Sequence, residues 1–248
     1  MILSLKNQTY NPPRVITGER FDSVMLRNVS GLSFVDCEIV QTGKTNVFVA
    51  TGCSDISISG GHIEGTPDLI LNGITLTNCK RVAIDGVKVR LCKRGIVIGG
   101  CEDVDVSRCL LTELRSDGID VGTSKRVTIA NNTIADFTIA PGDHPDAIQI
   151  ILAAVGALSS DITITGNSIF AAAQGITCFS HDRGVTENVT VTNNYICCLG
   201  PHGITMSQLG NSRVTDNVLA RHPSATKRPY VTVSGTGNVV ERNREPLN

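Results

Sequence analysis

Three aspartates and one glutamine recur at matching places within residues 116–150. Asp117 and Asp120 belong to the sequence SDGID, and Asp146 and Gln149 belong to DAIQI, which follows it along the chain. A carboxylic acid beside a carboxylate can protonate a glycosidic oxygen while its partner activates water or attacks carbon. A metal ion or an arginine beside a sugar uronate would instead acidify its C5 proton for elimination or epimerisation. These residue types leave both reactions open.

An internal repeat must position these side chains. Copies begin GITLTNCKRVAIDGVKV at Gly73, GIVIGGCEDVDVSRCLL at Gly95, GIDVGTSKRVTIANNTI at Gly118 and GITMSQLGNSRVTDNVL at Gly203. Apolar residues alternate with polar ones, and Val and Ile dominate the inward positions, which indicates short strands rather than helices. The first inward residues of successive copies are Val24, Val47, Ile74, Ile96, Ile119, Ile148, Ile176, Ile204 and Val231.

Strands this short, separated by polar turns at a fixed period, fit a coil of three strands. Stacked coils predict an all-β fold, a single-stranded right-handed parallel β-helix (a solenoid) of about nine rungs. We expect one domain over residues 1–248, with residues 1–20 as an N-terminal cap, 21–243 as rungs and 244–248 as a tail.

Two columns of like residues support this register. The first contains Asn132, Asn167, Asn194, Asn217 and Asn243, preceded by Cys37, Gly61, Val87 and Cys109. Asparagine there can accept a left-handed turn and pass amide hydrogen bonds from rung to rung. The second contains Cys53, Cys79, Cys101 and Ser124. Most of the nine cysteines follow the repeat rather than a disulfide or zinc spacing, so we expect buried free thiols.

Outward residues of the first strand should form two polar columns, because equivalent residues of adjacent strands lie about 4.8 Å apart. One column contains Arg94, Asp117, Asp146, Gln174 and His202, and the other contains Val97, Asp120, Gln149, Thr177 and Thr205. Long loops at 135–145 and 178–188 should wall the resulting groove. These borders carry Arg115, His144, Ser180, His181, Asp182 and Arg183.

The columns define the candidate site. We expect catalytic roles for Asp117, Asp120, His144, Asp146 and His202. Substrate-binding candidates are Arg94, Arg115, Gln149, Gln174, Thr177, His181, Asp182 and Arg183. Asp117 and Asp146, as neighbours, would repel if both were ionised, so one should have a raised pKa or a cation should lie between them. Ca²⁺ is the candidate cofactor, with no metal ligands assigned.

Composition narrows the partners. The net charge of −1 with no basic block argues against nucleic acid. No apolar run is long enough for a membrane span, and the N-terminus lacks the features of a signal peptide, which favours a cytoplasmic or virion-associated protein over a secreted one. Trp is absent and aromatic residues make up 4% of the chain, so glycan recognition should rest on charged and amide side chains.

Several segments resemble known families. The segment SDGID at 116–120 is similar to the NTDGID segment of the polygalacturonases, DAIQI at 146–150 to their D-C-I-A-I segment, and HGI at 202–204 to their H-G-x-x-I segment. The resemblance implies that Asp117, Asp120 and Asp146 are the carboxylates and that His202 is an assisting imidazole. Residues 70–245 resemble more closely the bacterial and phage β-helix proteins of the pectate-lyase-like superfamily.

Two functions from different classes follow. The first is a polysaccharide lyase or glycoside hydrolase that acts on a polar or acidic glycan in a groove over the first strands of the middle rungs. The second is a non-catalytic glycan-binding or structural protein of a phage virion or cell surface. A homo-oligomer fits either function, and a trimer fits the virion.

Overall fold

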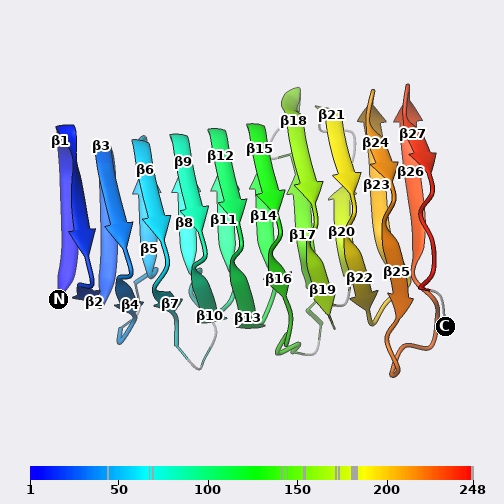
Figure 1. Ribbon diagram of the computed structural model, residues 1–248, viewed down its shortest axis with the longest axis horizontal. Helices are drawn as coiled ribbons and strands as arrows, with labels where there is room; N and C mark the ends of the chain where they lie inside the picture. Colours follow the sequence, from blue (N-terminus) through cyan, green and yellow to red (C-terminus); the bar gives the residue numbers. More distant parts are fainter. Residues whose placement is uncertain are drawn as a thin grey trace.

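The protein is a solenoid of stacked parallel strands (Figure 1). The computed structural model describes residues 1–43, 45–66, 68, 70–140, 142–143, 145–152, 155–170, 172, 174–179 and 184–246. Within this part of the chain every regular element is a strand, so the predicted all-β parallel β-helix of about nine rungs is confirmed. No helix in the described residues is long and apolar enough to cross a membrane.

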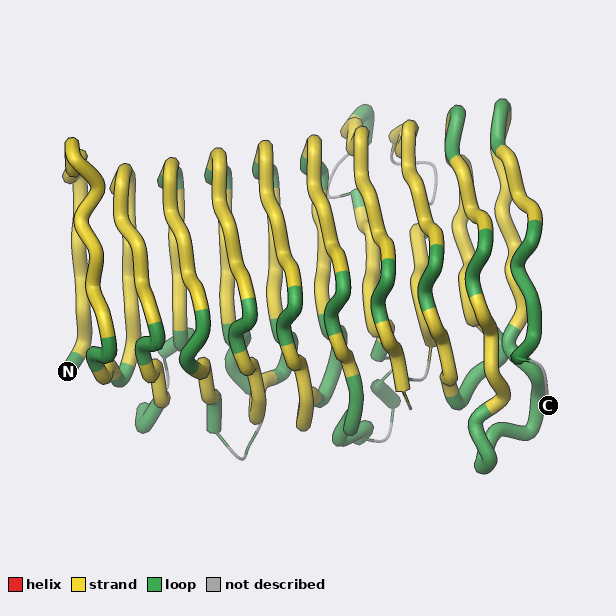
Figure 2. Tube along the Cα trace, viewed as in Figure 1, coloured by secondary structure: helices red, strands yellow, loops and turns green. Residues whose placement is uncertain are grey.

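A typical coil contributes a first, a second and a third strand, separated by short turns (Figure 2). The first strands are β1 (Ile2–Thr17), β3 (Ser23–Val35), β5 (Phe48–Thr51), β8 (Ile74–Thr77), β11 (Ile96–Gly99), β14 (Ile119–Gly122), β17 (Asp146–Ile151), β20 (Gln174–Phe179), β23 (His202–Gly210) and β26 (Tyr230–Thr236). The second strands are β6 (Ser54–Ser59), β9 (Lys80–Asp85), β12 (Glu102–Ser107), β15 (Lys125–Ala130), β18 (Ala157–Thr165), β21 (Gly184–Thr192), β24 (Arg213–Thr215) and β27 (Val239–Glu241). In β1 and β3 the first and second strands are continuous, and these two groups of strands form one sheet.

The third strands form a second, parallel sheet. They are β2 (Arg20–Phe21), β4 (Glu38–Val40), β7 (His62–Glu64), β10 (Lys88–Cys92), β13 (Leu110–Leu114), β16 (Thr133–Ile134), β19 (Ser168–Phe170), β22 (Tyr195–Cys198) and β25 (Val218–Arg221). Buried Val, Ile, Leu and Phe side chains from both sheets fill the space inside the solenoid.

The predicted inward stack of isoleucines is confirmed. Register pairs join Ile74, Ile96, Ile119, Ile148, Ile176 and Ile204 in sequence, and all six are fully buried. The prediction of Val47 in this stack is wrong by one residue, because Phe48 pairs with both Val24 and Ile74. Phe48 brings its ring against Phe34 edge to face, with the ring centroids 5.5 Å apart.

The N-terminal residues form part of the solenoid. Residues 1–20 were predicted to cap the first rung, and β1 covers β3 by pairing with it in parallel, from Ile2 opposite Ser23 to Thr17 opposite Val35. Strand β1 therefore adds a coil ahead of the predicted rungs. Its side chains are mostly exposed because a neighbour lies on one side only.

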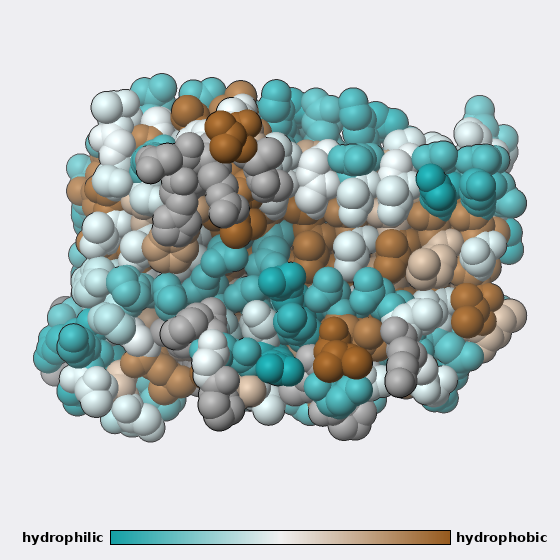
Figure 3. All heavy atoms as spheres, turned by 180° about the vertical axis from the view of Figure 1, so that it is seen from behind, coloured by the Kyte–Doolittle hydropathy of each residue, from teal (hydrophilic) through white to brown (hydrophobic). Residues whose placement is uncertain are grey.

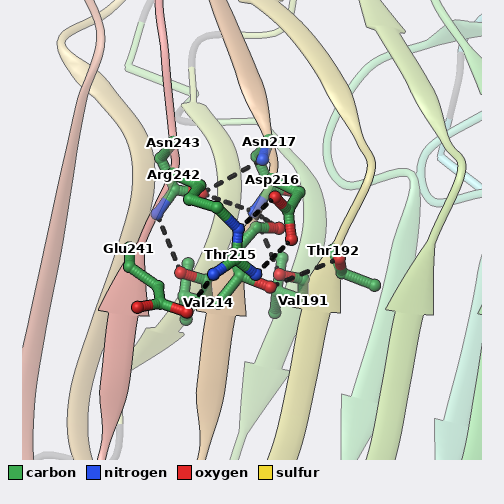
Figure 4. Close-up of polar contacts among 9 residues, drawn as sticks. All are labelled: Val191, Thr192, Val214, Thr215, Asp216, Asn217, Glu241, Arg242 and Asn243. Carbon is green, nitrogen blue, oxygen red and sulfur yellow. Dashed lines mark hydrogen bonds and ion pairs between the residues drawn. The ribbon is translucent and has the colours of Figure 1, made fainter.

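The asparagine column is a continuous hydrogen-bonded ladder inside the turn between second and third strands. The Oδ1 of Asn194 accepts from both the backbone N–H and the side-chain amide of Asn167, each at 2.9 Å. Asn194 in turn donates to Oδ1 of Asn217, and its amide also reaches the Ile164 carbonyl at 3.0 Å. Figure 4 shows the last step, in which Asn217 donates to Asn243. Each rung thus satisfies buried backbone groups of its neighbours.

The prediction that these asparagines adopt a left-handed backbone is wrong by one residue. The left-handed residue is the one before each ladder asparagine, such as Asn131, Asn193 and Asp216. That residue makes the turn, and the ladder asparagine that follows points its amide inward. On the outer side of the last turn, Arg242 pairs with Asp216 (Figure 4).

The cysteine column is also confirmed. The backbone N–H of Cys79 donates to Sγ of Cys101, whose own N–H donates to Oγ of Ser124. All nine cysteines are buried, as expected. Thiol and hydroxyl groups therefore satisfy the buried N–H groups before the second strands, as the amides do after them.

Replacing Asn194 by Ala should destabilise the protein by about 2 to 5 kcal/mol, because the Asn167 N–H and the Ile164 carbonyl would stay buried without partners. Urea unfolding measures this change. The control is Asn72→Ala, a half-buried asparagine outside the ladder, which should change stability much less. Equal losses from both substitutions would contradict a structural role for the ladder.

Candidate active site

The acid cluster, Asp117, Asp120 and Asp146, lies where two adjacent first strands begin. Asp117 precedes β14, Asp120 is its second residue, and Asp146 is the first residue of β17. Parallel pairing sets Asp120 opposite Gln149 and Gln149 opposite Thr177, as predicted for the second outward column. The backbone N–H of Asp146 donates to Oδ1 of Asp117 at 3.1 Å, which confirms that the first column brings these two residues together.

Arg94, one coil before the cluster, holds two of its carboxylates. Its Nε lies 3.2 Å from Oδ2 of Asp117 and 3.0 Å from Oδ2 of Asp120. The Ser116 hydroxyl donates to the same Asp117 oxygen at 3.1 Å. Asp117 therefore has an ion pair, a hydroxyl donor and a backbone donor.

Asp146 is held from the other side. Its Oδ2 accepts hydrogen bonds from the Gln149 amide at 2.5 Å and from the Thr177 hydroxyl at 3.0 Å. Thr177 belongs to β20, so donors from two coils fix the orientation of this carboxyl group. Gln174 lies opposite Asp146 in the register, which completes this part of the first column as predicted.

The cluster is buried, although its side chains point away from the core of the solenoid. Asp117 and Asp120 are each 6% exposed and Asp146 is 2% exposed. These carboxyl groups are therefore more buried than outward positions on a strand face would suggest. Neighbouring coils crowd the columns, and this crowding removes water from groups that an isolated strand would leave exposed.

Burial dominates the electrostatics of the cluster. It raises the pKa of Asp120 to about 8, with the negative charge of Asp117 adding to the shift and Arg94 opposing it. Burial also raises the pKa of Asp146 to about 7, against the hydrogen bonds from Thr177 and Gln149. A raised pKa was predicted for one carboxyl group of the cluster, and both Asp120 and Asp146 have one. At neutral pH the cluster can contain both a carboxylic acid and a carboxylate.

Each of these two carboxyl groups keeps one oxygen without a protein partner. Among the described residues, Oδ1 of Asp120, Oδ1 of Asp146 and Oε1 of Gln174 are buried and make no hydrogen bond. Leaving a buried polar atom unsatisfied costs about 1 to 3 kcal/mol, so such atoms often mark a place that a ligand completes. The three atoms belong to neighbouring positions of the two columns.

His202 lies farther along the first column, beyond the coil of Gln174. Its Nδ1 is 3.1 Å from the Thr205 hydroxyl and 3.2 Å from the Tyr230 hydroxyl, and the two rings meet edge to face. The structure therefore places His202 in the predicted column but in contact with Tyr230 rather than with the acid cluster.

The sequence analysis missed Tyr230 because of a bulge. Two residues lead from His202 to Ile204, but one leads from Tyr230 to Val231, so the register shifts between these strands. Counting back two residues from Val231 gives Pro229 instead. The exposed Tyr230 ring nevertheless continues the column.

The predicted loop residues are only partly placed. Arg115 pairs with Asp143, with Nε and Oδ2 2.8 Å apart, so its charge is neutralised within the loop. His144, His181, Asp182 and Arg183 lie outside the described residues. No group of three or more His, Cys, Asp or Glu side chains suited to hold a metal ion occurs within the described part of the chain.

A hollow of about 300 Å³ opens beside the cluster. Arg94, Asp120 and Gln149 line one side of it, and Val97 and Ile151 are among the apolar residues that line the rest. The first strands run up the rear of Figure 1, and Figure 3 views the molecule from that side. Hydrophilic surface runs along the middle of that face, with hydrophobic surface beside it. The hollow thus combines charged and apolar walls.

Comparison with known proteins identifies the family. A family model described as "Right handed beta helix region" matches residues 15–135 and 72–244. The chain belongs to this family of right-handed β-helix proteins. No curated protein matches the sequence.

Solved structures with this fold include enzymes and phage proteins. The hyperthermoactive exopolygalacturonase of Thermotoga maritima shares 13% identity with a TM-score of 0.60, over 96% of this chain and 68% of its own. The tailspike protein of E. coli bacteriophage HK620, solved with a pentasaccharide, shares 12% identity with a TM-score of 0.52, over 95% of this chain and 50% of its own. The alginate lyase from Paenibacillus sp. str. FPU-7 shares 17% identity with a TM-score of 0.50, over 85% and 88%. At these identities the likeness establishes the fold.

The raised pKa of Asp146 predicts how the stability of the protein depends on pH. Its pKa is about 7 in the folded protein and about 3.9 in an unfolded chain, so the stability it contributes at low pH is lost as the pH rises through 7. Asp146→Asn does not titrate and should therefore gain melting temperature relative to the wild type between pH 5 and pH 8. A gain of ~1 kcal/mol corresponds to about 2 to 4 °C in a chain of this size.

Thermal unfolding at several pH values tests this prediction, with Asp105→Asn as the control. Asp105 is exposed on β12, and its substitution should leave the pH dependence unchanged. If Asp146→Asn lowered the melting temperature at pH 8 by more than at pH 5, Asp146 would be a charged structural acceptor and the raised pKa would be wrong.

Proposed function

We propose that the protein is a glycan-cleaving enzyme that hydrolyses glycosidic bonds by acid–base catalysis at the acid cluster. The observation that carries the proposal is the pair Asp120 and Asp146 on adjacent coils. Both are buried, both have a raised pKa, and both keep Oδ1 without a protein partner. Two such carboxyl groups are what glycoside hydrolysis requires.

Asp120 is suited to the role of general acid. Its pKa of about 8 keeps it protonated at neutral pH, and Arg94 engages only its Oδ2. Among the described residues Oδ1 has no protein partner, and Asp120 lines the hollow, so this carboxyl group can carry the proton beside it. A proton donor at this place can be transferred to a glycosidic oxygen as the bond breaks.

Asp146 is suited to act as the base or nucleophile. With a pKa of about 7 it is ionised in part of the neutral range, and Gln149 and Thr177 engage only Oδ2, so Oδ1 keeps no protein partner in the described part of the chain. Asp117 pairs with Arg94 and accepts hydrogen bonds from the Ser116 hydroxyl and the Asp146 backbone N–H. The three carboxyl groups thus divide into an acid, a base and a partner of Arg94.

Arg94 favours hydrolysis over elimination. A lyase needs a positive charge beside the uronate carboxylate to acidify the C5 proton. The Arg94 guanidinium already pairs with Asp117 and Asp120, and Arg115 pairs with Asp143. These cations are committed to protein carboxylates, so the chemistry of the described site suits proton transfer to and from a glycosidic bond.

The family supports a glycan as the substrate. Similar folds belong to an exopolygalacturonase, an alginate lyase and a tailspike protein solved with a pentasaccharide. The chain spans about two thirds of the first and half of the tailspike, so action on a polysaccharide and association into a homo-oligomer are both proposed for this chain.

The pH dependence of kcat/KM should be bell-shaped. Below about pH 7 protonation of Asp146 removes the base, and above about pH 8 ionisation of Asp120 removes the acid.

Asp120→Asn and Asp146→Asn should each lower kcat/KM by about 10²-fold or more, while Asp105→Asn should not change it. The assay measures new reducing ends from polygalacturonate, alginate, galactan and the O-polysaccharide of E. coli, with and without Ca²⁺.

The outcomes separate the candidate functions. An unsaturated, ultraviolet-absorbing product would show a lyase and contradict hydrolysis. If no polysaccharide is cleaved but one is bound, the protein is a non-catalytic glycan-binding protein. In that case Asp146→Asn should weaken binding by about 0.5 to 3 kcal/mol, the range for a lost hydrogen bond.

A further inference from the structure

Two glycines form the floor of the hollow beside the acid cluster. Gly99 and Gly122 are register partners at the ends of β11 and β14, and both line the hollow with Asp120. Their column carries side chains in the neighbouring coils, in the order Thr51, Thr77, Gly99, Gly122, Ile151 and Phe179. The hollow therefore exists because side chains are missing from two consecutive coils.

The fold does not require glycine at these positions. Neither residue has a left-handed backbone, which is the usual reason for glycine in a turn. A Cβ at Gly99 would come no closer than 3.8 Å to another atom, and one at Gly122 no closer than 3.6 Å, which are ordinary contacts. Glycine within a strand weakens it and often marks a place where a ligand approaches the backbone closely.

Asp120 gives an independent sign of a ligand. It is 6% exposed, it lines the same hollow, and its Oδ1 makes no hydrogen bond within the described part of the chain. Gln149 and Arg94 stand beside it on the polar wall. The ligand must therefore offer a polar group to Asp120 and an apolar surface to the glycines, Val97 and Ile151.

We propose that this glycine hollow is the subsite for one uncharged pyranose ring of the glycan, which deepens and rests on the proposed hydrolase function. The C–H face of the ring lies on Gly99 and Gly122, between Val97 and Ile151. An oxygen substituent of the ring faces Asp120 and Gln149 on the polar wall. The volume of about 300 Å³ is at the small end of ligand pockets, about 300 to 1,000 Å³, and suits a single ring.

The polar wall selects an uncharged sugar. A hydroxyl group or glycosidic oxygen can accept a proton from neutral Asp120, and a hydroxyl can donate to ionised Asp120. A uronate carboxylate can only accept, and it would face the negative charge of Asp117 while Arg94 is already paired with Asp117 and Asp120. The ring next to the cleaved bond is therefore a neutral hexose or pentose rather than a uronic acid.

The test fills the hollow with side chains that a strand favours. Gly122→Val and Gly99→Val should keep or raise the melting temperature, because β-branched residues suit this position. The ligand is galactan or the E. coli O-polysaccharide, whichever of these neutral polysaccharides the wild-type protein cleaves. Both substitutions should weaken its binding by at least tenfold, and Gly122→Ala should weaken it less. Thr51→Val, in the same column but away from the hollow, is the control and should bind normally.

Calorimetric binding and kcat/KM on the same polysaccharide distinguish the outcomes. Wild-type binding by a well-folded Gly122→Val would overturn the subsite and leave the hydrolase function intact. A lowered melting temperature in both Gly122→Val and Gly122→Ala would make the glycine structural and also overturn it. Cleavage of polygalacturonate or alginate without cleavage of either neutral polysaccharide would overturn the uncharged ring. A wild-type protein that cleaves none of the four would instead contradict the proposed function.

Discussion

Parallel hydrogen bonding between consecutive coils is the constraint on which the rest of the structure depends. It fixes each residue beside its equivalent in the next coil, as the register from Ile96 to Ile119 to Ile148 shows. Inside the solenoid this repetition joins like with like, which suits apolar side chains and amides. Outside it, the same repetition places Asp117 beside Asp146, where like charges repel. The core and the acid cluster are thus two results of one register.

The polar columns inside the solenoid and those on its first strands differ in how completely their hydrogen bonds are satisfied. In the interior, every ladder asparagine finds both donor and acceptor in its neighbours, as Asn194 does between Asn167 and Asn217. On the first strands the column is heterogeneous, so Arg94 satisfies part of the acid cluster while Oδ1 of Asp120 and of Asp146 remain unpaired. A fully satisfied network stabilises the fold, and a partly satisfied one is a place for chemistry.

Periodicity predicted the architecture because a repeat reports on every coil at once. The isoleucine stack, the amide ladder, the buried thiols and the contact of Asp117 with Asp146 all followed from equivalent positions in the chain. Local irregularities could not be found in this way. Phe48 takes the place predicted for Val47 in the inward stack, and Tyr230 takes that of Pro229 in the outer column, each through a shift of one residue.

Burial was the other property that the sequence could not show. Outward alternation predicts that Asp120 faces solvent, but crowding by side chains of adjacent coils depends on three-dimensional packing. The hollow over Gly99 and Gly122 was likewise hidden, since a glycine in a strand has several explanations until its surroundings are known. A signal was present in the sequence, because both glycines interrupt a column of larger residues in neighbouring coils.

The central claim is that burial within the stacked coils keeps two carboxyl groups protonated near neutral pH. Carbon-13 NMR of protein labelled at the aspartate side-chain carboxyl measures this directly, with Asp120→Asn and Asp146→Asn assigning the signals. We expect one carboxyl signal to titrate near pH 7 and another near pH 8, each absent from the corresponding variant. Titration of every aspartate below about pH 5, in the usual range for exposed carboxyl groups, would contradict the account.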